Sequence, residues 1–341
     1  MTSRCRIRRH SFLAGWLWLS PTLAATLLLA ILHLSTGARP VPISVLVEAA
    51  TAFDPGSFDQ QVLVNLRLPR LVAALICGAS SAMAGLLLQS LLRNPLGEPH
   101  ILGLNAGASL AVVASAALPA ALQPQGLTRS LLAATGGGAL FLIVLTIASA
   151  GRVGLTMTKL IFCGIALSAL ASAFVSAILI LDQDTLEQVR LWLVGDLAGV
   201  SRPDVVSALP MVVAAMLAAA MITPRLDAMA LGDASATGLG VPVRSTRIIG
   251  LCAAAALSGA AVAVAGPIGF IGLIVPAIAR KLAGGPHIVA LVLAAALGAA
   301  LLVAADIAAR NLLPSHEIAT GITTALVGAP VFLLLVARTI K

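Results

Sequence analysis

Charged side chains are scarce in this chain of 341 residues, of which only 10% are Asp, Glu, Lys or Arg. A soluble domain carries about 25% charged residues, so the composition excludes a soluble fold for the chain. Tyrosine is absent, and aromatic residues make up 3% of the sequence. No polar stretch is long enough to fold as a separate domain. A globular enzyme tethered by a membrane anchor is therefore excluded as well.

Cysteine is also rare, and its four copies are isolated from one another: Cys5, Cys77, Cys163 and Cys252. Three of them lie inside apolar runs, where a free cysteine is typically a small buried hydrophobe. No CxxC pair is present, and the five histidines show no spacing typical of metal ligands. We therefore expect neither a disulfide framework nor a metal site.

Catalytic motifs are missing too. The sequence contains no nucleophile elbow, no HExxH and no Gly-Lys-Ser/Thr phosphate loop. Its three lysines, Lys159, Lys281 and Lys341, do not follow glycine. We therefore expect a chain that is not an enzyme, binds no cofactor and cannot hydrolyse a nucleotide. If it performs active transport, the energy must come from another subunit.

Long apolar runs are what the sequence has in abundance, because 60% of its residues are hydrophobic. A membrane-spanning helix needs roughly 20 apolar residues. Ten runs are long enough to be candidate spans: 12–34, 71–92, 101–118, 130–150, 160–181, 205–222, 248–265, 267–282, 288–308 and 321–337. Only helices satisfy the backbone of such runs in lipid. The sequence thus predicts an all-α polytopic membrane protein of about ten transmembrane helices, in a single domain over residues 1–341.

The basic residues predict the orientation. When the N-terminal tail 1–11 is placed in the cytoplasm, fourteen of the 21 Lys and Arg residues fall on the cytoplasmic side. These are Arg4, Arg6, Arg8, Arg9, Arg93, Arg152, Lys159, Arg225, Arg244, Arg247, Arg280, Lys281, Arg338 and Lys341. The bias satisfies the positive-inside rule and predicts that both termini are cytoplasmic. Since the basic residues separate apolar runs and do not form one solvated patch, nucleic-acid binding is disfavoured.

Ionisable residues are nearly absent from the middles of the runs. A transporter driven by an ion gradient normally keeps such residues within its spans, so this alternative class is disfavoured. Asp306 and Arg310 are an exception near the outer end of the run 288–308. Their spacing of i and i+4 predicts that they pair with each other.

Five segments are rich in polar, proline and glycine positions: Arg67–Arg70 (RLPR), Arg93–Gly103 (RNPLGEPHILG), Ala230–Gly240 (ALGDASATGLG), Gly266–Pro276 (GPIGFIGLIVP) and Glu317–Pro330 (EIATGITTALVGAP). In this order and spacing they resemble the permease subunits of binding-protein-dependent ABC importers for ferric siderophores, haem and cobalamin. The resemblance covers roughly residues 60 to 338, nearly the whole chain.

The resemblance implies a cobalamin-importer-like permease fold in the inner membrane of a bacterium. It implies a second permease copy, identical or related, around a central pathway. Two cytoplasmic ATP-binding subunits would consume ATP and Mg, and a periplasmic or lipid-anchored substrate-binding protein would deliver the cargo. Ferric siderophore is the first expectation for the cargo, with haem or cobalamin left open.

The inner loop 225–247 is predicted to hold a short helix. Asp233 is placed to cap its first turn, and Gly238 or Gly240 to end it. On sequence alone, a solvated connector is an equally good interpretation. The resemblance instead implies a helix that couples to the ATPase, built from Leu231, Gly232, Asp233, Ala234, Ala236, Gly238, Leu239 and Gly240.

Three arginines, Arg67, Arg70 and Arg310, lie on the outer side, where the orientation rule disfavours basic residues. They could snorkel to lipid phosphate. Alternatively, they could form bidentate pairs with carboxylates of a docking protein. The resemblance favours docking of the substrate-binding protein.

Two further segments have open interpretations. Arg93–Gly103 is either a structural turn on the inner side or a brace against the ATPase. The glycine and proline positions of the segment 266–276 predict a bent helix start. These positions are Gly266, Pro267, Gly269, Gly272 and Pro276. Close helix packing and lining of the pathway are both compatible with this pattern.

Overall fold

The structure, a computed structural model, describes residues 15–37, 39–119, 127–150, 156–313 and 317–339. The predicted cytoplasmic tail 1–11 lies outside these ranges. Within them, every regular element is a helix. The prediction of an all-α protein is therefore confirmed.

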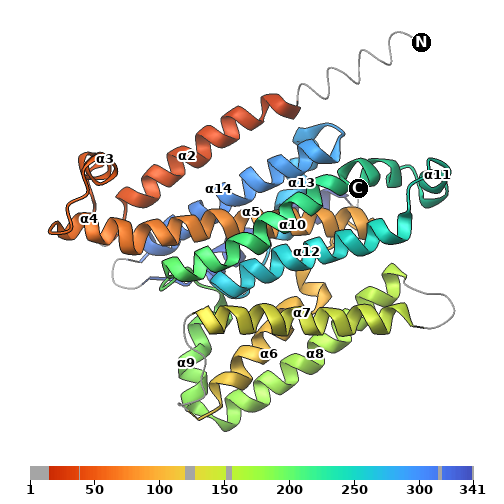
Figure 1. The fold of residues 1–341 in the computed structure, drawn as a ribbon, viewed down its shortest axis with the longest axis horizontal. Helices are drawn as coiled ribbons and strands as arrows, with labels where there is room; N and C mark the ends of the chain where they lie inside the picture. The colour runs from red at the N-terminus through yellow and green to blue at the C-terminus, as the bar shows by residue number, and fades with distance from the viewer. Residues whose placement is uncertain (1–14, 38, 120–126, 151–155, 314–316, 340–341) are drawn as a thin grey trace.

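Every predicted apolar run overlaps one helix of the structure (Figure 1). These helices are α2 (Leu19–Ser35), α5 (Leu68–Leu92), α6 (Leu104–Ala116), α7 (Leu127–Ser149), α8 (Met157–Leu181), α10 (Arg202–Met229), α12 (Val243–Ala265), α13 (Ile271–Ala283), α14 (His287–Asn311) and α15 (Thr320–Thr339). Shorter elements connect them: α3 (Ile43–Thr51), α4 (Phe58–Val62), the π-helical turn η1 (Leu63–Arg67), the 3₁₀ turn η2 (Pro99–Leu102), α9 (Gln183–Val194) and α11 (Asp233–Gly238).

The helices differ in length. Among the described residues, seven are long and apolar enough to cross a membrane, and α6 and α13 have only 13 residues each. The chain is thus a multi-pass membrane protein built from long spans and shorter apolar helices. The predicted count of about ten is consistent with this arrangement.

The helices α5 and α12 form the centre of the molecule. In each of them 78% of the apolar window is buried, against 11% in α2 and in α8. In Figure 1, α6, α7, α8 and α9 group on one side of α12, while α2, α13 and α14 lie on the other side of α5. The peripheral helices expose apolar side chains, as expected for surfaces that face lipid or another subunit.

Glycine contacts set the position of α5. A Cβ atom added to Gly78 would overlap the carbonyl oxygen of Gly298 in α14. One added to Gly85 would overlap the carbonyl oxygen of Gly272 in α13. Small residues let helix backbones approach this closely where no aqueous hydrophobic drive holds them together.

Two helices begin later than the apolar runs predict. Residues 266–270 are not helical, because Gly266 (φ 71°) and Phe270 (φ 69°) are left-handed. The helix α13 therefore starts at Ile271 and not at residue 267. Similarly, the 3₁₀ turn at Pro99–Leu102 delays the start of α6 to Leu104.

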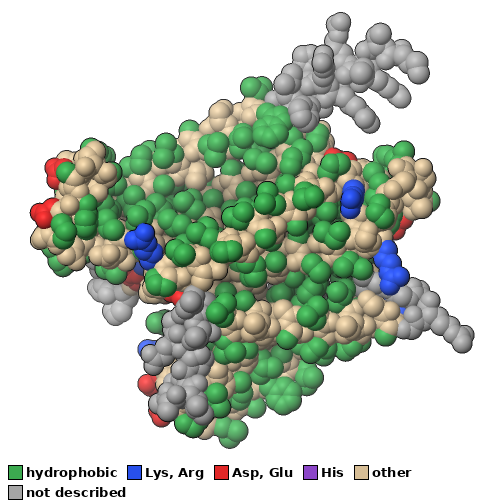
Figure 2. Space-filling view, viewed as in Figure 1, with side chains coloured by type: hydrophobic (Ala, Val, Ile, Leu, Met, Phe, Trp, Pro, Cys, Tyr) green, Lys and Arg blue, Asp and Glu red, His purple; other side chains and the backbone are tan. Residues whose placement is uncertain are grey.

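Figure 2 shows hydrophobic side chains across the middle of the visible face, with acidic and basic side chains towards its ends. One end carries α4 and the start of α5, and the opposite end carries α11 (Figure 1). Following the orientation predicted by the basic residues, we call these the outer end and the inner end. An apolar middle between charged ends matches the requirements of a bilayer.

Candidate functional site

The outer arginines lie on one continuous helical segment. The helix that crosses the membrane at α5 extends outward through η1 and α4, so it covers Phe58–Leu92. This extends well beyond the predicted start at residue 71. Arg67 and Arg70 are consequently three residues apart on one helix, a spacing that places both on the same face.

Asp306 on α14 is the centre of a buried charge cluster, and its carboxylate is 0% exposed. Arg310 Nε lies 3.4 Å from Asp306 Oδ2, which confirms the predicted pairing. Arg70 Nε and Nη2 donate to the same carboxylate over 3.0–3.2 Å. This second arginine was not predicted as a partner of Asp306.

Two further side chains complete the cluster around Asp306. His33 Nε2 of α2 lies 2.8 Å from Asp306 Oδ2, and His33 is 0% exposed. Thr320 Oγ1, at the start of α15, donates to Asp306 Oδ1 over 2.8 Å. We define the outer cluster as His33, Arg70, Asp306, Arg310 and Thr320. It joins α2, α5, α14 and α15 at one carboxylate.

The remaining outer arginine is held by backbone groups. Arg67 is 7% exposed; its Nη1 donates to the carbonyl oxygen of Leu34 over 2.6 Å, and its Nη2 to that of Arg39. Arg310 Nη2 also donates to a carbonyl oxygen, that of His33, over 3.1 Å. The guanidiniums of Arg67, Arg70 and Arg310 thus lie against protein groups, whereas snorkelling would place them at lipid phosphate. Each guanidinium has five N–H groups, so each retains donors beyond these bonds.

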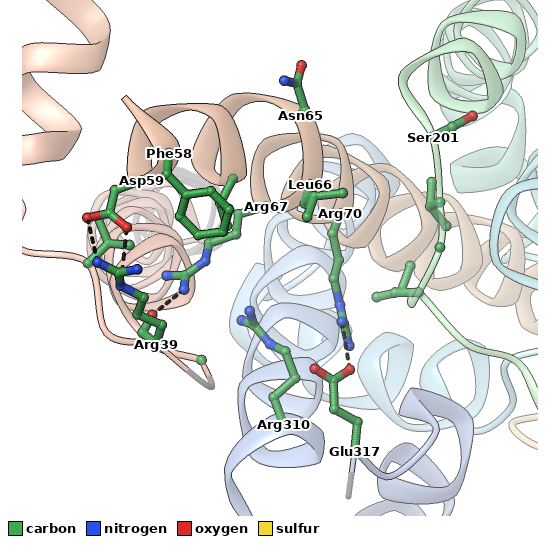
Figure 3. A pocket seen from close by; sticks show the side chains of 16 residues that line it. Arg39, Phe58, Asp59, Asn65, Leu66, Arg67, Arg70, Ser201, Arg310 and Glu317 are labelled. Atoms are coloured by element: carbon green, nitrogen blue, oxygen red, sulfur yellow. Dashed lines mark hydrogen bonds and ion pairs between the residues drawn. The ribbon is translucent and has the colours of Figure 1, made fainter. Parts of the chain in front are cut away.

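The three outer arginines line one open cavity of about 520 Å³, which we call the outer pocket. Arg39 and Glu317 also line it, and neither was predicted as a site residue. In Figure 3, Arg70 points towards Glu317, and the Nη1 to Oε2 distance is 2.9 Å. Arg39 Nε pairs with Asp59 Oδ1 at 3.3 Å on the other side of the pocket.

At the inner end, the predicted loop 225–247 is shorter than expected. The helix α10 continues to Met229 and α12 starts at Val243, so only residues 230–242 connect them. The predicted short helix is present as α11 and ends at Gly238, as expected.

The predicted capping role of Asp233 is wrong. Gly232 (φ 110°) occupies the N-cap position of α11, and no side chain caps the helix. The carboxylate of Asp233 pairs instead with Arg93 Nη2 at 2.7 Å and Arg247 Nη2 at 2.6 Å. Two charge-assisted partners are stronger than one backbone N–H. We define Arg93, Asp233 and Arg247 as the inner cluster.

The helix α11 is anchored on one side and exposed on the other. Ala236 is 0% exposed, and its carbonyl oxygen accepts a hydrogen bond from the N–H of Val241. Leu231 and Leu239 flank the helix and are 67% and 65% exposed. Ala234, Gly238 and Gly240 are exposed as well. The inner end therefore presents apolar side chains around a short fixed helix.

The glycine-rich segment 266–272, which leads into the first turn of α13, is closely packed at two of its three glycines. A Cβ atom on Gly266 would overlap the carbonyl oxygen of Trp192, and one on Gly272 would lie 2.9 Å from that of Ser81. At Gly269, the nearest atom would be 4.0 Å away. Pro276 is buried inside α13, and the carbonyl of Pro267 lies against Gly195. This geometry supports close packing, and lining of the pathway stays a prediction.

The segment Arg93–Gly103 folds back against α13. Glu98 Oε1 accepts a hydrogen bond from the N–H of Phe270 over 3.0 Å. The ring of Pro99 approaches Gly272. Glu98, which was expected in an inner loop, is therefore a support for the start of α13.

Among the described residues, no group of three or more His, Cys, Asp or Glu side chains is arranged to hold a metal ion. The described sites are a basic pocket at one end of a helical membrane protein and an anchored helix at the other. Such an arrangement is compatible with a membrane permease that contacts partner proteins at both ends.

The chain belongs to the FecCD transport family, whose family model matches residues 25–338. The Fe(3+)-citrate import system permease protein YfmD of Bacillus subtilis (strain 168) is 40% identical over 307 residues, which cover 90% of each chain. The vitamin B12 import system permease protein BtuC of Vibrio parahaemolyticus serotype O3:K6 (strain RIMD 2210633) is 41% identical, over 82% of this chain and 84% of its own. A solved inward-facing metal-chelate type ABC transporter matches 94% of this chain and 98% of its own with a TM-score of 0.82 at 27% identity.

These matches confirm the resemblance inferred from the five sequence segments. The chain is the membrane permease of an ABC importer and is not itself an enzyme. It works with an ATPase and a substrate-binding protein. Family membership also sets aside the alternative of a transporter driven by an ion gradient.

Proposed function

We propose that this permease moves a ferric chelate across the inner membrane of a bacterium. The observation that carries the proposal is the end-to-end match with permeases named for ferric citrate and ferric enterobactin. The vitamin B12 permease relative, at 41% identity, favours cobalamin as the second candidate.

Uptake into proteoliposomes tests the cargo. The permease, its ATPase and its substrate-binding protein would be reconstituted and offered radiolabelled ferric citrate, a ferric siderophore or cobalamin. We expect ATP-dependent accumulation of a ferric chelate and no accumulation of cobalamin. Uptake of cobalamin alone would contradict the proposed cargo.

We propose that two permease copies, each with an ATP-binding subunit, surround one pathway, and that both termini are cytoplasmic. The bias of fourteen basic residues to the inner side supports the orientation. Mass measurement of the purified complex tests the stoichiometry, and protease protection of a C-terminal tag in sealed vesicles tests the orientation.

We propose that the outer pocket receives an acidic group of the substrate-binding protein. Arg67, Arg70 and Arg310 line this pocket, and each guanidinium has N–H groups beyond those bonded to protein groups. Arginine is suited to this role because its planar fork matches a carboxylate. Loss of affinity at high salt would support the proposal, since interactions between exposed charges are screened by salt.

We propose that α11 and its flanking leucines bind the ATPase. Exposed Leu231 and Leu239 beside a fixed short helix support this role. Co-purification of the ATPase with the double variant Gly232→Arg/Asp233→Arg tests it, and Asp184→Arg in α9 is the matched control at the outer end. We expect the double variant to lose the ATPase and the control to keep it. Retention of the ATPase by the double variant would contradict the role of α11.

A further inference from the structure

The guanidinium of Arg70 is held by two carboxylates in different environments. Its Nε and Nη2 face Asp306, which is 0% exposed, while its Nη1 faces Glu317, which is 50% exposed. Arg70 itself is 12% exposed. One edge of the guanidinium is therefore fixed inside the protein, and the other reaches the solvent-exposed side of the outer pocket.

The two carboxylates differ in the free-energy cost of breaking their ion pairs with Arg70. Removal of Asp306 from its partners would leave buried charges without compensation, which is strongly unfavourable. Glu317 can rotate into water, and an exposed ion pair contributes little stability. Asp306 is thus a fixed anchor for Arg70, and Glu317 is a contact that can be exchanged.

Glu317 occupies the position that an incoming carboxylate needs. Arg39, Arg67, Arg70 and Arg310 all line the outer pocket, against the acids Asp59 and Glu317. The positive excess attracts an acidic group, but Nη1 of Arg70 is already paired across 2.9 Å. A docking carboxylate therefore competes with Glu317 for this edge of Arg70, and it gains the whole edge only when Glu317 leaves.

We infer that Glu317 is a displaceable counter-ion that pairs with Arg70 in the free permease and yields to an Asp or Glu side chain of the docking protein. Asp306 acts as a positioning residue, because it orients Arg70 without reaching the pocket. The inference rests on the proposed docking role of the outer pocket. Its consequence is that the permease lowers its own affinity for the docking protein, which favours release after delivery.

The test measures binding of the purified substrate-binding protein of the same import system to the permease–ATPase complex in nanodiscs. We expect Glu317→Gln to bind two- to five-fold more tightly than the wild type, the range that corresponds to an exposed ion pair of about 0.5–1 kcal/mol. The affinity of this variant should also fall more steeply with salt, because the pocket loses one negative charge and its positive excess grows. Glu317→Asp should restore the wild-type affinity.

Glu48→Gln in α3 is the matched control. It removes one exposed outer carboxylate that does not line the pocket, so it reports the effect of net charge alone. A comparable gain in affinity for Glu48→Gln would overturn the inference. So would an unchanged or weaker affinity of Glu317→Gln while the wild type binds, and docking itself would then stand. If the wild type does not bind the docking protein at all, the docking role fails and the inference fails with it.

Discussion

The two ends of the molecule contain the same motif, a carboxylate between two arginines, in opposite environments. At the outer end Asp306 pairs with Arg70 and Arg310 and is 0% exposed. At the inner end Asp233 pairs with Arg93 and Arg247 and is 42% exposed. Both clusters attach to α5, since Arg70 lies in its first turn and Arg93 directly follows its last residue.

The difference in burial gives the two clusters different mechanical properties. A buried cluster cannot lose one member without leaving uncompensated charge, so the outer cluster fixes four helices relative to one another. An exposed pair exchanges easily with water, so the inner cluster can let α11 shift against α5. A fixed surface at the outer end and an adjustable helix at the inner end suit the docking and coupling roles that we propose for them.

The largest expected effect is at the outer cluster. Asp306→Asn removes the only negative charge among the five cluster side chains, and the free energy of unfolding should fall by about 3–5 kcal/mol. Thermal unfolding of the purified permease in detergent measures this. Asp184→Asn, an exposed acid in α9, is the control and should leave the melting temperature near that of the wild type. A melting temperature of Asp306→Asn equal to that of the control would contradict the interpretation of a buried anchor.

A second variant tests whether the close contact between α5 and α13 stabilises the protein. Gly85→Val places a side chain where even a Cβ atom would overlap the backbone of Gly272. Overpacking of this kind typically costs about 1–3 kcal/mol, and thermal unfolding reports it. Gly138→Val in α7 is the matched control, because a Cβ atom there meets nothing within 4 Å. Equal losses for both variants would show that close contact between α5 and α13 is not the cause.

At the inner cluster, we expect a substitution to change the stability of the permease little while it reduces coupling to the ATPase. Asp233→Asn removes one exposed pair, with Arg93, and one partly exposed pair, with Arg247, so the free energy of unfolding should fall by no more than about 1 kcal/mol. Stimulation of the ATPase by the loaded substrate-binding protein should nevertheless decrease, because α11 loses its links to α5 and α12. ATP hydrolysis by the reconstituted complex checks this. A loss of stability as large as that of Asp306→Asn would remove the distinction between the two ends.

The smallest expected effect is that of salt on the melting temperatures of the two aspartate variants. Raising the ionic strength from 0.1 M to 1 M shortens the screening length from about 10 Å to about 3 Å. The difference in melting temperature between the wild type and Asp233→Asn should then disappear. The corresponding difference for Asp306→Asn should persist, because buried pairs are screened much less. Loss of both differences at 1 M salt would contradict the burial of the outer cluster.

The sequence was sufficient to predict which segments are helical, but not at which residues the helices begin and end. Apolar runs predicted the helices because burial in lipid requires them. The end of α10 at Met229 was missed because polar residues near an interface are compatible with helix or loop. The start of α13 was missed because the left-handed conformation of Phe270 depends on its hydrogen bond to Glu98, which is 172 residues away in the chain.

By itself, the sequence determined the all-α membrane class, the family and the pairing of Asp306 with Arg310, since composition and spacing along one helix are local properties. Only the tertiary structure decided that Arg70, 236 residues from Asp306, and His33, 273 residues from it, share the same carboxylate. It also decided that Asp233 pairs with two arginines and does not cap its own helix. Charges in an apolar interior take whichever partner the packing brings within reach, because an unpaired charge there is too costly to leave.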